Sequence, residues 1–157
     1  MEILGKTPIN PMLFITGKLG GYISWAIAVS EAIRYGIDFE LDNPLKIYTA
    51  LILVLLGLIF LVFSSIFLGK NVRMGIPLEE TKLKTLGIYK ISRNPMYIGL
   101  HLITLSSIVF TLNIFVIILG LYSIFIYHLI ILKEEVFLVD RFGNKYEEYK
   151  KNVRRYI

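Results

Sequence analysis

The sequence of 157 residues has no cysteine, only two histidines, and charged side chains at just 18% of its positions. Without cysteine there are no disulfides, thiolate metal sites or cysteine nucleophiles. A protein metal site usually needs three or four ligands, so His101 and His128, both inside apolar segments, are interpreted as packing or hydrogen-bonding residues, and no metal site is predicted. Glycine-rich phosphate loops, dinucleotide-binding fingerprints, H-E-x-x-H patterns and Ser-His-Asp patterns are also missing. The commonest nucleotide-binding, metallopeptidase and thiol-dependent sites are therefore excluded.

Hydrophobic residues make up 55% of the chain, and the mean hydropathy is +0.66. They lie in long blocks, which predicts an all-α integral membrane protein with a single membrane domain over residues 1–157. The net charge of +5 does not indicate a nucleic-acid partner, because Lys and Arg concentrate in residues 70–93 and 133–155, next to apolar spans. The N-terminus lacks the pattern of a cleaved signal peptide, so the first span is expected to remain.

About four transmembrane helices are predicted. Residues 96–132 contain no Asp, Glu, Lys or Arg. As one helix this stretch would measure about 55 Å, well beyond a hydrocarbon core of about 30 Å, so it must fold back as a helical hairpin. Thr111-Leu112-Asn113 is the best turn within it. The predicted spans lie near residues 12–33, 45–68, 96–111 and 114–132.

The basic loop 69–95 and the basic tail 133–157 then share one side of the membrane. The positive-inside rule makes that side cytoplasmic and places both termini there. Five apolar residues of the tail are spaced as one helix face, which predicts a cytoplasmic amphipathic C-terminal helix: Phe142, Tyr146, Tyr149, Val153 and Tyr156. This topology brings residues 89–97 and 134–141 together as the two cytoplasmic ends of one hairpin.

The base of this hairpin collects polar residues at a membrane boundary: Arg93, Asn94, Tyr97, Glu134, Glu135 and Arg141. Asn94-Pro95 is typical of a helix start, with Asn as N-cap and Pro at the first helical position. One interpretation is structural, with an ion pair of the Arg93–Glu134 type clamping the hairpin. The other is a cofactor pocket, in which helix-start amides bind a carboxylate, a Glu holds an ammonium and tyrosines face a sulfonium. Those features suit S-adenosylmethionine.

Two motifs carry a family resemblance. The first is Gly87-x-Tyr89-x-x-x-Arg93-Asn94-Pro95-x-Tyr97-x-Gly99, and the second is Glu134-Glu135-x-x-Leu138-x-x-x-Phe142-Gly143-x-x-Tyr146-x-x-Tyr149-x-x-x-Val153-x-Arg155. Together they resemble the isoprenylcysteine carboxyl methyltransferase family, to which phospholipid N-methyltransferases are related. The resemblance covers roughly residue 69 to the end of the chain. It implies an integral membrane enzyme that binds S-adenosylmethionine in a cytoplasmic pocket.

The resemblance also implies roles for individual residues. Cofactor contacts are expected at Tyr89, Asn94, Pro95, Tyr97 and Glu134, and in a loop formed by Thr81, Lys82, Leu83 and Lys84. Two positions depart from the family pattern. Asn94 stands where these enzymes usually have His, and Ile130 stands where they carry an Arg thought to engage the substrate carboxylate. The second departure makes a prenylcysteine substrate doubtful.

The predicted function is therefore S-adenosylmethionine-dependent methyl transfer to a lipid-like or prenylated acceptor in the membrane. In the mechanistic hypothesis, Arg93 or Arg141 orients an acidic head group, and Glu135 or Tyr97 assists an amine or hydroxyl acceptor. The alternatives are a phospholipid amine N-methyltransferase and a non-enzymatic four-span module. No oligomeric state is predicted.

Overall fold

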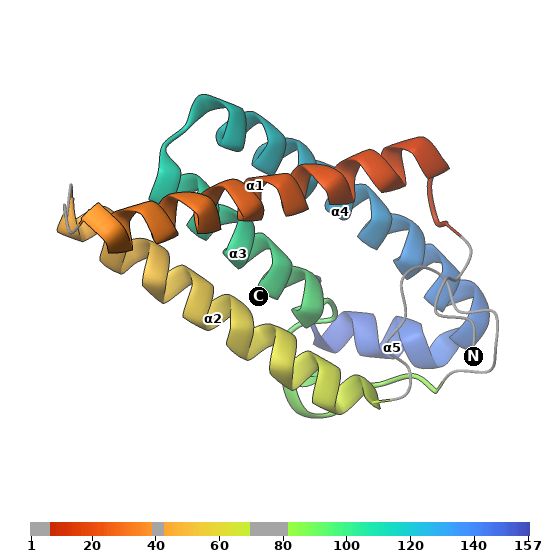
Figure 1. Ribbon diagram of the computed structural model, residues 1–157. Coiled ribbons are helices and arrows are strands. Elements are labelled where there is room, and N and C mark those ends of the chain that lie inside the picture. Colours follow the sequence, from red (N-terminus) through yellow and green to blue (C-terminus); the bar gives the residue numbers. More distant parts are fainter. Residues whose placement is uncertain (1–6, 39–42, 70–81) are drawn as a thin grey trace.

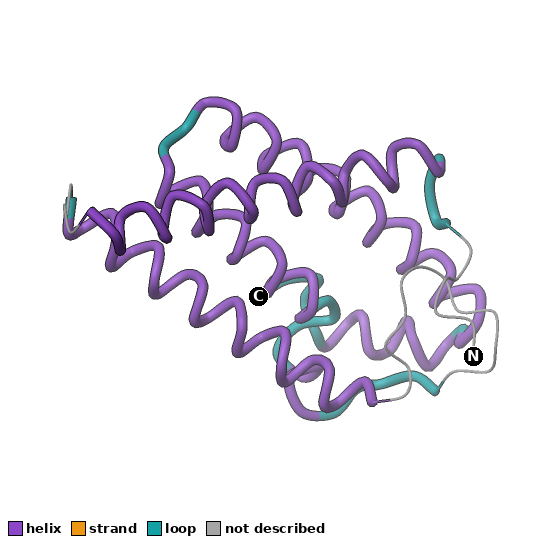
Figure 2. The backbone as a smooth tube through the Cα atoms, in the orientation of Figure 1, coloured by secondary structure: helices purple, strands orange, loops and turns teal. Residues whose placement is uncertain are grey.

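The computed structural model describes residues 7–38, 43–69 and 82–157. All regular structure in this part of the chain is helical. The elements in order are α1 (Pro11–Asp38), α2 (Pro44–Leu68), the 3₁₀ helix η2 (Gly87–Lys90), α3 (Pro95–Thr111), α4 (Ile114–Phe142) and α5 (Asn144–Asn152). Figure 1 shows α3 between α1 and α2, with α4 passing behind α1 and α5 beside the far end of α4. Figure 2 shows how little of the described backbone lies outside helices.

Three of the described helices, α1, α2 and α4, are long and apolar enough to cross a membrane, and α3 is a shorter apolar helix of 17 residues. Large apolar side chains cover the outside of α2; Ile52, Leu55 and Ile66 are each 58–65% exposed. Such a surface is unfavourable in water but matches lipid hydrocarbon. The prediction of an all-α integral membrane protein is confirmed.

The predicted hairpin turn is also found. Leu112 adopts a left-handed conformation with φ 49°, and its N–H donates to the Ile108 carbonyl at 2.9 Å. Asn113 then caps α4 by accepting a hydrogen bond from the Phe115 N–H at 2.9 Å. These local signals end one helix and start the next within two residues, which forces α3 and α4 to run antiparallel.

Helix α4 continues past residue 132, the end of the predicted last span, and ends at Phe142. It therefore carries Glu134 and Glu135 within a continuous helix. In the folded protein each carboxylate has polar partners on neighbouring elements, so the helix continues without leaving a charge unpaired. Helix α1 is likewise longer than the predicted 12–33 and ends at Asp38.

Glycine permits the closest helix contacts. A Cβ added to Gly99 of α3 would lie 2.8 Å from the Gly57 carbonyl oxygen, and one added to Gly57 of α2 would lie 2.9 Å from the Gly99 carbonyl oxygen. On the other side of the bundle, a Cβ on Gly21 of α1 would lie 2.7 Å from the Ser123 hydroxyl of α4. Small residues therefore allow the close approach of both helix pairs.

The C-terminal segment corrects the predicted extent of the last helix. Gly143, with φ 53°, ends α4, and α5 buries Tyr146 and Tyr149 as the apolar spacing indicated. The helix stops at Asn152, however, and Val153 is extended with φ −129° and ψ 131°. Residues 153–157, here called the C-terminal strap, therefore do not continue the predicted helix face.

Candidate active site

The two adjacent carboxylates of α4 point to different partners. At Glu134, the hydroxyl of Tyr97 donates to both carboxylate oxygens at 2.9 Å. Lys18 of α1 lies close enough for its charge to interact with Glu134, and its Nζ sits 3.8 Å from the centre of the Phe14 ring. The charge of Lys18, although it lies within an apolar span, thus belongs to the hairpin base.

Glu135 is only 4% exposed and is held by three side chains. Arg93 Nη2 lies 3.1 Å from its Oε1, and the Asn94 amide donates to the same oxygen at 3.1 Å. Arg155 donates to Oε2 through both Nη2 at 2.9 Å and Nε at 3.1 Å. Two guanidinium groups and an amide compensate the buried charge. The clamping ion pair therefore forms at Glu135, and not between Arg93 and Glu134 as the structural interpretation had it.

The C-terminal strap supplies one of those guanidinium groups and bonds across the hairpin base. The Arg93 N–H donates to the Arg154 carbonyl at 3.0 Å, and the Ser92 hydroxyl donates to the Arg155 carbonyl at 3.0 Å. Farther along, the Tyr156 hydroxyl lies 2.7 Å from His128 Nδ1. Arg155 is the last residue of the second sequence motif, but no role was predicted for it. Its place in that motif was the only sequence feature that could have indicated a role at the site.

Asn94 occupies the N-cap position of α3 but does not cap it with its side chain. Its amide is used instead on Glu135 and on the Arg155 carbonyl, at 3.1 and 3.3 Å. The N–H groups in the first turn of a helix have no partner within the helix. The buried start of α3 at Pro95 is therefore a place where an anionic ligand group can find backbone donors.

Tyr89 lies in η2 and is buried, with 7% of its surface exposed. Its carbonyl accepts a hydrogen bond from the Tyr149 hydroxyl of α5. Burial raises the pKa of the Tyr149 phenol to about 12, so this hydroxyl remains protonated and able to donate at neutral pH. Burial, with the nearby charge of Glu134 contributing, also raises the pKa of Tyr89. Tyr89 is thus near enough to Glu134 for the carboxylate charge to act on its phenol.

The remaining predicted residues are less tightly gathered. Arg141 lies on the last turn of α4, two turns beyond Glu134, with its guanidinium 5.6 Å from the Phe137 ring. Residues 82–84 are irregular backbone leading into η2, and Thr81 lies outside the described residues. Nδ1 of His101, one turn below Tyr97, is buried without a hydrogen-bond partner in the described part of the chain. The prediction that the two ends of the hairpin meet is confirmed by the contacts at Glu134 and Glu135.

Comparison with known families gives this arrangement a context. A family model described as phospholipid methyltransferase matches residues 45–145, which run from the start of α2 into α5. The chain belongs to the phospholipid methyltransferase family. The match includes both paired carboxylates and the Arg93–Tyr97 segment. Neither the curated proteins nor the solved structures gave a match.

Membership of the phospholipid methyltransferase family makes the protein a membrane methyltransferase. The more specific resemblance to isoprenylcysteine carboxyl methyltransferases is not what this match supports. The family match ends before the C-terminal strap, so Arg155 and Tyr156 lie outside it. In this chain the strap nevertheless contributes directly to the geometry of the hairpin base.

Proposed function

We propose that this methyltransferase uses S-adenosylmethionine to methylate a lipid acceptor at the membrane surface. The observation that carries the proposal is the pairing of Tyr97 with Glu134 beside the buried start of α3. Glu135 is already compensated by two guanidinium groups, whereas the hydrogen bonds to Glu134 in the described residues come from one neutral hydroxyl. Glu134 is therefore the carboxylate with capacity for a cationic ligand.

The residues present fit the methyl donor. S-adenosylmethionine carries one carboxylate, one ammonium and one sulfonium, and its methyl group is transferred when the carbon–sulfur bond breaks. Glu134 and the rings of Tyr89 and Tyr97 would hold the cationic groups, and the backbone amides after Pro95 would hold the carboxylate. Since the sulfonium is a good leaving group, the main tasks of the protein are orientation and exclusion of water.

Glu135 fits a positioning role in this scheme. Its bonds to Arg93 and Asn94 fix the segment that precedes α3, and its bonds to Arg155 fix the C-terminal strap. Both oxygens of Glu135 already contact these partners, so the carboxylate is engaged in holding the site together. This arrangement favours Arg93 and Glu135 as supports of the site over their sequence-based role in the reaction. Arg141 keeps its predicted role in orienting an acidic head group.

A phospholipid amine is the acceptor that the structure favours. Ile130 stands where isoprenylcysteine enzymes carry a substrate-binding Arg, and in this protein it is 1% exposed and packed with Phe14, Ile126 and Tyr127. That position cannot offer a cation to a prenylcysteine carboxylate. The family match to phospholipid methyltransferases supports the same acceptor class.

The test is methyl transfer by the purified full-length protein from labelled S-adenosylmethionine. Vesicles that contain phosphatidylethanolamine and a prenylated cysteine peptide are supplied in parallel. Label in the lipid head group supports the proposal. Label in a methyl ester of the peptide would instead identify a prenylated cysteine as the acceptor. If neither product is labelled and the protein does not bind S-adenosylhomocysteine, the non-enzymatic membrane module becomes the better explanation.

Both termini and the hairpin base are proposed to be cytoplasmic, because Lys84, Lys90 and Arg93 lie at that end.

A further inference from the structure

Lys18 is a charged side chain inside a membrane span, and it lies near the candidate active site. It is the only charged residue between Pro11 and Ser30 of α1. The side chain is half-buried, and its Nζ lies 3.8 Å from the centre of the Phe14 ring. Among the described residues this ammonium has no hydrogen bond and no ion pair. A charge within a membrane span is costly without a partner, so Lys18 indicates that an anion binds there.

The packing of α1 on α4 directs Lys18 toward the candidate donor site. The two helices run in opposite directions (Figure 1), and Gly17 of α1 leaves room for Ile126 of α4. Side chains of a helix tilt toward its N-terminus, so Lys18 extends over Phe14 and toward the later residues of α4. Its charge consequently interacts with that of Glu134, although the two groups form no direct ion pair.

Lipid can reach the Lys18 ammonium along the outer face of α1. Ile15 and Leu19, three residues before Lys18 and one after it, are 55% and 49% exposed. Such side chains on a spanning helix face the hydrocarbon of the bilayer. Lys18 therefore lies at the border between the lipid-facing surface and the interior of the bundle.

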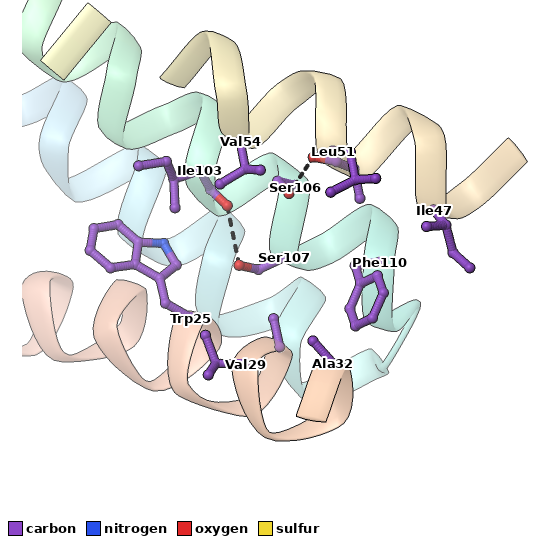
Figure 3. A pocket seen from close by; sticks show the side chains of 12 residues that line it. Trp25, Val29, Ala32, Ile47, Leu51, Val54, Ile103, Ser106, Ser107 and Phe110 are labelled. Atoms are coloured by element: carbon purple, nitrogen blue, oxygen red, sulfur yellow. Dashed lines mark hydrogen bonds between the residues drawn. The ribbon is translucent and has the colours of Figure 1, made fainter. Parts of the chain in front are cut away.

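The other half of α1 borders an apolar cavity, which offers a charged head group no partner. Its volume is ≈ 220 Å³, and the residues that line it carry no charge. Figure 3 shows Trp25 and Val29 of α1 facing α2 across this space. Its serines, Ser106 and Ser107, already donate to backbone carbonyls at 2.8 and 3.1 Å. A head group that approaches α1 is therefore bound at the hairpin-base end and not in this cavity.

The charges at the hairpin base are incomplete once a methyl donor is bound. S-adenosylmethionine carries one net positive charge, while Lys18 and Glu134 cancel each other. Glu135 supplies no further negative charge, because two guanidinium groups already surround its carboxylate. An uncompensated charge away from water is costly, so an anionic group is needed beside the donor. A phospholipid whose amine has lost its proton brings that group as its phosphate.

The chemistry of an ethanolamine phospholipid limits where its phosphate can lie. Only two carbon atoms separate the amine from the phosphate oxygen, and the amine must reach the methyl group beside Glu134. Arg141 is seven residues farther along α4, about 10 Å at 1.5 Å per residue. Lys18, whose charge interacts with Glu134, is closer to the place where the phosphate must be.

We propose that Lys18 binds the phosphate of the phospholipid acceptor and so selects phospholipid amines over membrane amines without a phosphate. This inference rests on the proposed function, since it concerns the acceptor of that reaction. The ammonium donates hydrogen bonds to phosphate oxygens, and no bond is made or broken at Lys18. Helix α1 precedes the residues that the family model matches, 45–145, so this contact is supplied from outside the matched region.

The test compares methyl transfer by full-length variants to two acceptors, phosphatidylethanolamine and octadecylamine, a long-chain amine without phosphate. Lys18→Met keeps an apolar stem and removes the charge. It is expected to raise the KM for phosphatidylethanolamine by roughly tenfold or more and to leave the KM for octadecylamine unchanged. Lys145→Met is the matched control, because it removes the same charge from an exposed position on α5 and should change neither KM.

A second measurement detects lipid binding without turnover. Native mass spectrometry in the presence of S-adenosylhomocysteine is expected to show less bound phosphatidylethanolamine on Lys18→Met than on the wild type or Lys145→Met. Titration calorimetry should show that Lys18→Met binds S-adenosylhomocysteine at least as tightly as the wild type, because a cation that competes for Glu134 is gone. This result would exclude misfolding as the cause of the lost lipid.

The outcomes separate this inference from the enzymatic proposal. Equal KM values for phosphatidylethanolamine, or equal lipid binding, in Lys18→Met and the wild type would overturn the role of Lys18. A rise in KM for Arg141→Met alone would overturn it too and would place the phosphate at Arg141. If the wild type transfers no methyl group to any acceptor, the enzymatic proposal fails, and the lipid-binding comparison still decides whether Lys18 binds phosphate.

Discussion

The hydroxyl of Tyr97 donates to both carboxylate oxygens of Glu134, at 2.9 Å each. This contact joins the first turn of α3 to the end of α4 that is proposed to be cytoplasmic. A phenol has one proton, which these two oxygens share, so the carboxylate keeps most of its capacity to accept further hydrogen bonds. Lys18 approaches from α1 and contributes a positive charge to the same cluster. Three helices thus converge on one carboxylate.

Glu134→Gln is expected to weaken binding of S-adenosylhomocysteine by roughly ten- to a hundredfold, because a hydrogen bond to a charged group contributes about 1.5–3 kcal/mol. Titration calorimetry on the purified protein measures this change. Glu148→Gln is the control, since Glu148 is exposed on α5, and it should leave the Kd unchanged. Equal effects of the two variants would contradict the assignment of Glu134 to the donor site.

Glu135→Ala is expected to lower the free energy of unfolding by about 3–5 kcal/mol, because it leaves the buried guanidinium of Arg93 uncompensated. Thermal denaturation in detergent reports the change as a lower Tm. The matched control is Glu147→Ala, which removes the exposed Lys150–Glu147 pair, and it should cost at most about 1 kcal/mol. A Glu135→Gln variant with wild-type Tm but no methyl transfer would contradict the supporting role. It would favour the role predicted from the sequence, in which Glu135 assists the acceptor.

Gly99→Ala is expected to destabilise the protein by about 1–3 kcal/mol, because its Cβ would approach the Gly57 carbonyl oxygen to 2.8 Å and push α2 from α3. Gly36→Ala provides the opposite case. A Cβ there meets nothing within 4 Å, and alanine favours the helix over glycine by about 0.5–1 kcal/mol, so its Tm should not fall. If Gly99→Ala has the Tm of Gly36→Ala, the close approach of α2 and α3 is not needed for stability.

Much of the fold was predictable because its signals are local. The charge-free run 96–132 exceeds the thickness of a bilayer, and Thr111-Leu112-Asn113 supplies the turn that the length requires. Pro95 and Asn113 fixed where α3 and α4 begin. The meeting of the two hairpin ends followed from that turn without knowledge of any tertiary contact. The donor-site assignments remain predictions, and what the structure adds is the grouping of Tyr89, Tyr97 and Glu134.

The different partners of Glu134 and Glu135 could not be predicted from local sequence signals. Successive residues of an α-helix point about 100° apart, so the two carboxylates face different neighbours. Which neighbours those are depends on helix packing and on the path of the strap. Lys18 approaches Glu134 because the glycines of α1 allow close contact with α4. Arg155 reaches Glu135 because the chain leaves its helix after Asn152 and bonds back to Ser92 and Arg93.

The sequence by itself determined the membrane class, the hairpin and the pair of motifs, since hydropathy, capping and spacing act between residues near in the chain. Only the tertiary structure decided which carboxylate is compensated and which keeps capacity for a ligand. It also decided that a cavity lies between α1 and α2. Both outcomes depend on how distant side chains fill or leave space where helices meet, and that space is a property of the packed bundle.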